Sequence, residues 1–117
     1  MTSGPSGPAI VDARDLPASA LDAAAQFHAS LVPLVREQAQ KLPLVVVDFA
    51  AADHTHASWR QAVVGQLACE LAPVRVNAIA SVSEAPEARA QALAYLTRAP
   101  GVTGQVLCLD GNRCENS

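Results

Sequence analysis

Lysine is almost absent from this 117-residue chain, which holds a single one, Lys41, beside seven scattered arginines. Carboxylates outnumber the basic groups, and the formal net charge is −3. A protein that binds nucleic acid neutralises phosphates with clustered Lys and Arg, so we expect no nucleic-acid partner. No apolar run approaches the roughly 18 residues of a membrane span, so we expect no membrane partner either.

Cysteine is also scarce. Cys69, Cys108 and Cys114 are an odd number with no CxxC spacing, which does not favour a disulfide framework or a structural zinc site. We therefore expect a cytoplasmic location. The abundance of Ala and Arg with so little Lys favours a bacterial source.

Large aromatic side chains make up only 3% of the chain, although half of its residues are apolar. The core must therefore be built from Ala, Val and Leu, whose small side chains let helices lie close to a sheet. The length suits one small domain. We interpret residues 1–14 as a flexible N-terminal segment, 15–111 as the domain and 112–117 as a tail.

Apolar spacing within the domain changes between helical and extended periods. The spacing predicts helices over about 20–41 and 57–71 and a third before residue 97, because apolar residues recur every three or four positions. Short β-branched or alternating runs predict strands at 44–47, 74–80 and 105–109. The order αβαβαβ predicts the α/β class, with about three parallel strands and three helices in a small three-layer, Rossmann-like half domain.

Several segments resemble the second half of short-chain dehydrogenases/reductases. The stretch LACELA (67–72) followed by VRVNAIA (74–80) resembles that family's helix and next strand, and VTGQVLCLDG (102–111) resembles its ending. ALAYL (92–96) and LVPLVR (31–36) resemble two of its other helices. The segments are most similar to the β-ketoacyl carrier-protein reductase subgroup, and we interpret the chain as a truncated, degenerate C-terminal half.

The resemblance also locates the family's catalytic positions. The Tyr and Lys of such reductases fall on Asp53 and Ala57, and the carbonyl-polarising Ser falls at Asp48-Phe49. The helix Asn of the family falls near Ala20. The glycine-rich turn that holds NAD(P) has no counterpart here. We therefore expect no cofactor, no catalytic residue and no reductase activity for this chain on its own.

The resemblance implies that the retained helices and last strand are the family's subunit interfaces. We therefore predict a non-catalytic protein that self-associates, as a dimer, or pairs with a full-length short-chain reductase, in fatty-acid or polyketide synthesis. Half of a split NAD(P)-dependent ketoreductase is the alternative. Candidate interface residues are Val32, Val35, Arg36, Trp59, Val63 and Leu67, although Trp59 is equally suited to the core.

The sequence also contains a candidate metal site. His54 and His56 lie beside Asp53, and such side chains can coordinate zinc, but a closed or catalytic site needs further ligands. We interpret this segment as a polar loop capping the next helix, and we predict no bound metal.

Overall fold

The computed structural model describes residues 7–82 and 86–109. Its elements, in chain order, are β1 (Ala9–Ala13), α1 (Ala20–Gln26), a π-helical turn (Phe27–Leu31), α2 (Val32–Ala39), β2 (Leu44–Ala50), a 3₁₀ turn (His54–His56), α3 (Ala57–Leu71), β3 (Arg75–Ser81), α4 (Pro86–Arg98) and β4 (Val106–Cys108). The α/β class, the alternation and the parallel strands are confirmed. The tail at 112–117 lies outside the described residues.

The sheet contains four parallel strands in the order β1-β2-β3-β4, one more than the sequence predicted. The additional strand, β1, lies inside the segment 1–14 that we interpreted as flexible, and it pairs with β2 from Ala9↔Val45 to Ala13↔Phe49. Its inward side chains, Ala9, Val11 and Ala13, alternate with exposed ones. Two of those three are alanines, so the alternation is too weakly apolar to stand out from a linker.

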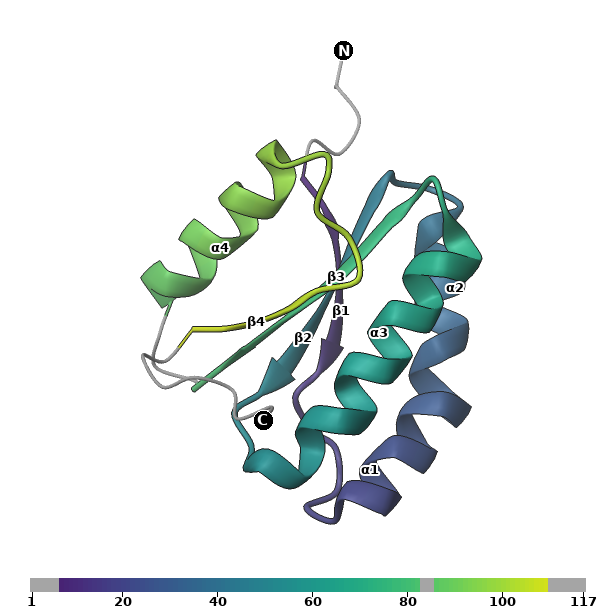
Figure 1. Cartoon of the computed structure of the whole chain (residues 1–117), viewed down its shortest axis with the longest axis vertical. Helices are drawn as coiled ribbons and strands as arrows, with labels where there is room; N and C mark the ends of the chain where they lie inside the picture. The colour runs from purple at the N-terminus through teal and green to yellow at the C-terminus, as the bar shows by residue number, and fades with distance from the viewer. Residues whose placement is uncertain (1–6, 83–85, 110–117) are drawn as a thin grey trace.

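Helices cover both faces of the sheet, with α1, α2 and α3 on one side and α4 on the other (Figure 1). Strand β2 shows why the sequence favoured this arrangement. Val45, Val47 and Phe49 pack into the larger core under α1–α3, whereas Leu44 and Val46 pack under α4. In a sequence, a strand buried on both faces is a continuous apolar run, and residues 44–47 form such a run.

Helix α4 covers only part of its face of the sheet. The smaller core beneath it draws on β2, β3 and the region around β4, and contains no residue of β1. The side chains of β1 on that face, Ile10 and Asp12, are exposed, and Ile10 retains 43% of its accessible surface. Within residues 7–82 and 86–109, no element therefore covers the face of β1 on the α4 side.

The predicted helix over 20–41 is one continuous helical segment with a π-helical turn at its centre. Pro33 stands in the first turn of α2 and has no N–H to donate to the preceding turn. The loss of that backbone hydrogen bond accounts for the irregular turn just before α2. The turn directs Phe27 into the core, where the side chain is fully buried.

Candidate functional site

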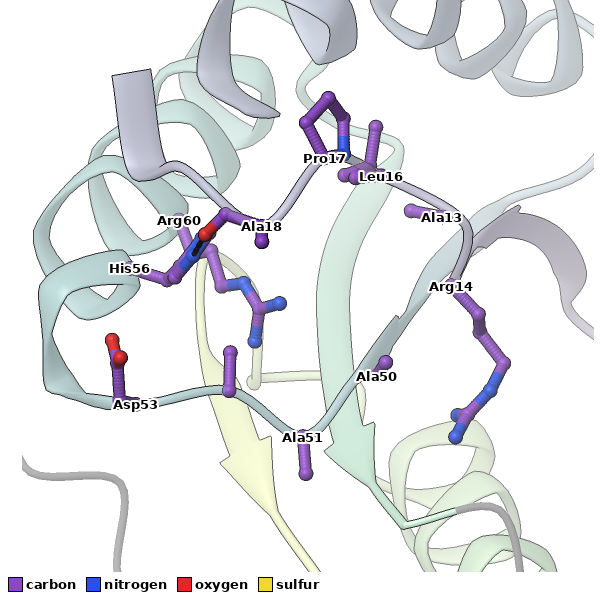
Figure 2. Close-up of a pocket in the computed structure, with 11 residues that line it drawn as sticks. Ala13, Arg14, Leu16, Pro17, Ala18, Ala50, Ala51, Asp53, His56 and Arg60 are labelled. Carbon is purple, nitrogen blue, oxygen red and sulfur yellow. Dashed lines mark hydrogen bonds between the residues drawn. The ribbon is translucent and has the colours of Figure 1, made fainter. Parts of the chain in front are cut away.

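A pocket of about 250 Å³ lies beyond the carboxyl ends of β1 and β2 (Figure 2). This edge is where open parallel sheets bind their ligands. One wall is the segment after β1, another is the segment after β2, and the start of α3 forms the third. The lining residues are Ala13, Arg14, Leu16, Pro17, Ala18, Ala50, Ala51, Ala52, Asp53, His56 and Arg60.

His56 lines the pocket but is held on both ring nitrogens. Nδ1 accepts a hydrogen bond from Nε1 of Trp59 at 3.0 Å, and Nε2 lies 2.9 Å from the carbonyl oxygen of Ala18. An indole N–H can only donate, so Nδ1 is the acceptor and Nε2 donates to the carbonyl. With 6% of its surface exposed, this histidine joins α3 to the segment before α1 and has no free nitrogen for proton transfer.

Asp53 begins the helical segment that contains α3. Its carboxylate accepts hydrogen bonds from the backbone N–H and the hydroxyl of Thr55, which is N-cap geometry. The Thr55 hydroxyl contributes most to lowering the pKa of the Asp53 carboxyl, followed by the Thr55 backbone N–H. The predicted capping loop is therefore confirmed, and at neutral pH this side chain is a carboxylate rather than a proton donor.

Arg60 extends from α3 into the pocket (Figure 2). Its guanidinium carbon lies 4.3 Å from the centroid of the Phe49 ring and 5.9 Å from that of Trp59. Phe27, Phe49 and Trp59 form a mutually packed cluster with all three centroid distances at 5.6 Å. Three of the chain's four large aromatic side chains thus gather next to one arginine.

The charge of Arg60 is buried without compensation. The residue is 8% exposed, and within the described part of the chain it forms no hydrogen bond or ion pair, and its Nε is buried without a partner. Burial lowers the pKa of Arg60 to about 10, which still leaves it a cation at neutral pH. A cation–π contact is worth about 0.5–2 kcal/mol, whereas burying an ion costs several kcal/mol. Stacking on Phe49 therefore offsets only part of the cost.

A second polar cluster lies beside the pocket and is centred on the carboxylate of Asp48. Oδ1 of this buried carboxylate accepts from Arg14 at 3.1 Å, and Oδ2 accepts from Arg89 of α4 at 2.6 Å. Arg14 also donates to the carbonyl oxygens of Phe49 and Ser81, at 3.1 and 2.7 Å. Figure 2 shows the Arg14 guanidinium directed away from the pocket. The cluster ties the ends of β1, β2 and β3 to α4.

The positions that the resemblance assigned to catalysis hold residues with structural roles. Asp48 is the centre of the paired cluster, and its neighbour Phe49 is fully buried under Arg60. Asp53 is the cap described above, and Ala57, the first residue of α3, carries no ionisable group. Ala20 opens α1. The chain's one tyrosine, Tyr95, is half-exposed on α4, in the layer opposite α3.

The predicted interface residues lie mostly in the interior. Val32, Val35, Val63 and Leu67 are buried in the core under α1–α3, and Trp59 packs against that core through the aromatic cluster. Of the six, only Arg36 is exposed, where it forms a two-point ion pair with Glu70 at 2.6 and 2.8 Å. The sequence located the apolar stripe of each helix correctly, but that stripe faces the sheet. Apart from Arg36, these side chains do not form an outer surface in the described structure.

In residues 7–82 and 86–109, no three His, Cys, Asp or Glu side chains are grouped so that they could hold a metal ion. Cys69 is a free, exposed thiol on α3, whereas Cys108 in β4 is disulfide-bonded, which the cysteine count did not indicate. No helix of the described segments is long and apolar enough to cross a bilayer.

The parallel sheet, the helices on both faces and the pocket at the carboxyl edge define a small doubly wound α/β protein, compatible with a Rossmann-like half domain. A family model described as "Short chain dehydrogenase-like protein" matches residues 11–109, from within β1 to just past β4. The chain therefore belongs to this short-chain dehydrogenase-like family. No curated protein and no solved structure matches it.

Proposed function

We propose that this chain is a short-chain dehydrogenase-like protein that performs no reductase chemistry and acts by associating with a second copy of itself. The proposal that the chain performs no reductase chemistry rests on the residues that stand at the family's catalytic positions. A ketoreductase needs a proton donor of tuned pKa within reach of its substrate. Here the corresponding side chains are a capping carboxylate at Asp53, a methyl group at Ala57 and a paired carboxylate at Asp48.

The support for association comes from β1. This strand pairs with β2 on one side and with no other described strand, so its outer edge offers unpaired N–H and C=O groups. Exposed strand edges are templates for pairing with another chain. Ile10 adds a half-exposed apolar side chain on the face that α4 leaves uncovered. A two-fold axis through this edge would pair β1 with its copy antiparallel and continue the sheet across both subunits.

The experiment is the oligomeric state of the purified full chain, measured by light scattering at micromolar concentration. We expect a dimer for the natural chain and a monomer for Ile10→Lys, which places a charge beside the pairing edge. Leu21→Lys is the matched control, because Leu21 is 84% exposed on α1, away from this face. A well-folded monomer for the natural chain would sink the proposal of self-association.

A second candidate partner and a candidate pathway rest on the family similarity. A full-length short-chain reductase is the alternative partner, and the sequence resemblance to carrier-protein reductases is the support for a proposed role in fatty-acid or polyketide synthesis. NAD(P)H fluorescence distinguishes these cases. We expect no cofactor signal for the isolated chain. If cofactor binding and ketone reduction arise when a partner chain is added, the chain is instead half of a split ketoreductase.

A further inference from the structure

We infer that the pocket beyond β1 and β2 binds a small carboxylate through the guanidinium of Arg60. The inference concerns a face of the molecule other than the edge of β1, so it stands or falls independently of self-association. It rests on a buried cation with no counter-charge among the described residues, on the pocket into which this cation is directed, and on the walls of that pocket.

Arg60 differs from the other buried or half-buried arginines in the described part of the chain. Arg14 and Arg89 pair with Asp48, although the Nε of Arg89, like that of Arg60, is buried without a partner. Arg75 donates to the carbonyl oxygens at the end of α4, at 2.8 Å each. Only Arg60 combines 8% exposure with no hydrogen-bond partner. A folded chain satisfies its buried polar groups almost without exception, so an orphan of this kind indicates a missing partner.

The guanidinium is held in a position suited to an anion. The guanidinium carbon lies over the Phe49 ring, 4.3 Å from its centroid, which holds the group in place. The guanidinium is planar with all its N–H bonds in that plane, and Figure 2 shows the group reaching into the hollow between the segments after β1 and β2. A planar fork of donors is the geometry that binds a carboxylate at two points.

The walls select the size and charge of the ligand. Alanines make up nearly half of the lining residues (Ala13, Ala18, Ala50, Ala51 and Ala52), and the pocket volume of about 250 Å³ is below the range of typical drug-sized sites. The exposed Asp53 carboxylate on the rim disfavours a second negative charge. A singly charged acid with a short apolar body therefore fits better than phosphate or sulfate.

The chain contains its own reporter of binding. Trp59 is the only tryptophan, and its ring lies 5.9 Å from the Arg60 guanidinium carbon. Acetate, butyrate, phosphate and sulfate are titrated against the full chain at constant ionic strength, with tryptophan fluorescence as the readout. We expect a saturable change for acetate and butyrate, tighter for butyrate, and weaker binding of phosphate and sulfate.

Substitutions assign the effect to Arg60. Arg60→Met should raise the dissociation constant of butyrate by at least about tenfold, and Arg60→Lys should raise it less, because the charge remains but the fork is lost. Arg98→Met removes an equally positive but exposed residue of α4 and should leave it unchanged. Circular dichroism checks that each variant folds.

The nitrogen signal of Arg60 Nε in the natural chain provides a second readout that requires no variant. Butyrate should shift this resonance along the same saturation curve as the fluorescence. Fluorescence that does not saturate, an equal response in Arg60→Met, or an unmoved Nε signal would each overturn the inference. Tight binding of phosphate without binding of carboxylates would overturn the assignment of the ligand class.

Discussion

Replacing Arg60 with Met should make the ligand-free protein more stable, which is the reverse of the usual result at a buried position. Arg60 is 8% exposed, and its Nε has no partner in the part of the chain that the structure describes. Methionine has a similar length, fills the same space with apolar atoms and carries no charge. It also retains a favourable contact with the Phe49 ring through its sulfur.

The magnitude follows from three contributions. Exchanging buried ionic groups for apolar residues of similar volume changes stability by about 0 to 4 kcal/mol in favour of the apolar form. The substitution also removes a cation–π contact, which destabilises the variant by about 0.5–2 kcal/mol. The new sulfur–aromatic contact offsets about 0.3–1.5 kcal/mol of that loss. Solvent in the pocket reduces the cost of the natural charge, so we expect a net gain of about 1–2 kcal/mol. For a chain of this length that corresponds to a rise in Tm of about 4–8 °C.

The assay is thermal unfolding by circular dichroism, in a buffer free of carboxylates, with Arg75→Met as the control. Arg75 is also partly buried, but it donates to the carbonyl oxygens of Leu96 and Ala99, so the same substitution leaves acceptors unpaired and should lower Tm. Opposite signs for the two substitutions support the reasoning. If Arg60→Met lowers Tm as Arg75→Met does, the charge of Arg60 is compensated in the folded protein and the reasoning is refuted.

The two remaining predictions concern carboxylates of the site region. Asp48→Asn should destabilise the chain by about 2–4 kcal/mol in urea unfolding, because both partner guanidiniums lose their counter-charge; an unchanged midpoint would show that the cluster contributes nothing. The pKa of Asp53 is lowered from its ordinary 3.8, so its stabilisation is present above that pH and is lost as pH falls through the lower folded value. Asp53→Asn retains the cap without the titration, so between pH 5 and 2 the Tm of this variant should fall less than the Tm of the natural chain. If the two curves of Tm against pH are parallel, the Asp53 carboxylate does not contribute the pH-dependent stability assigned to it.

Strongly periodic segments were predictable, and weakly apolar ones were not. The run of valines in β2 and the apolar stripe of α3 are strong enough patterns to identify a strand and a helix, and both elements lie where the pattern predicted them. Strand β1 was missed because Ala9 and Ala13 are small, so its burial depends on pairing with β2 rather than on its own hydrophobicity. Local pattern cannot report a partner distant in sequence.

The candidate site shows the same division. Sequence resemblance identified Asp48, Asp53 and Ala57 as substitutions at reductase positions, and the described structure gives the two carboxylates a structural role as a pairing centre and a helix cap. Arg60 lies inside the predicted helix over 57–71, and no role was predicted for it from the sequence. Its position beside Val63 and Val64 on the buried side of α3 was a signal, because a charged residue on a buried stripe needs a partner or a ligand.

The amino-acid sequence by itself determined that the chain is a small parallel α/β domain of the short-chain dehydrogenase-like family, because periodicity and motif spacing are local properties of the chain. Tertiary structure alone decided that the apolar stripe of each helix packs against the sheet and not against another subunit's helix, and it placed Val35 and Leu67 in the core. It also decided that Asp48 has two arginine partners while Arg60 has none among the described residues. Whether a charge is compensated depends on atoms that distant segments bring within a few ångströms, and the order of residues does not contain those distances.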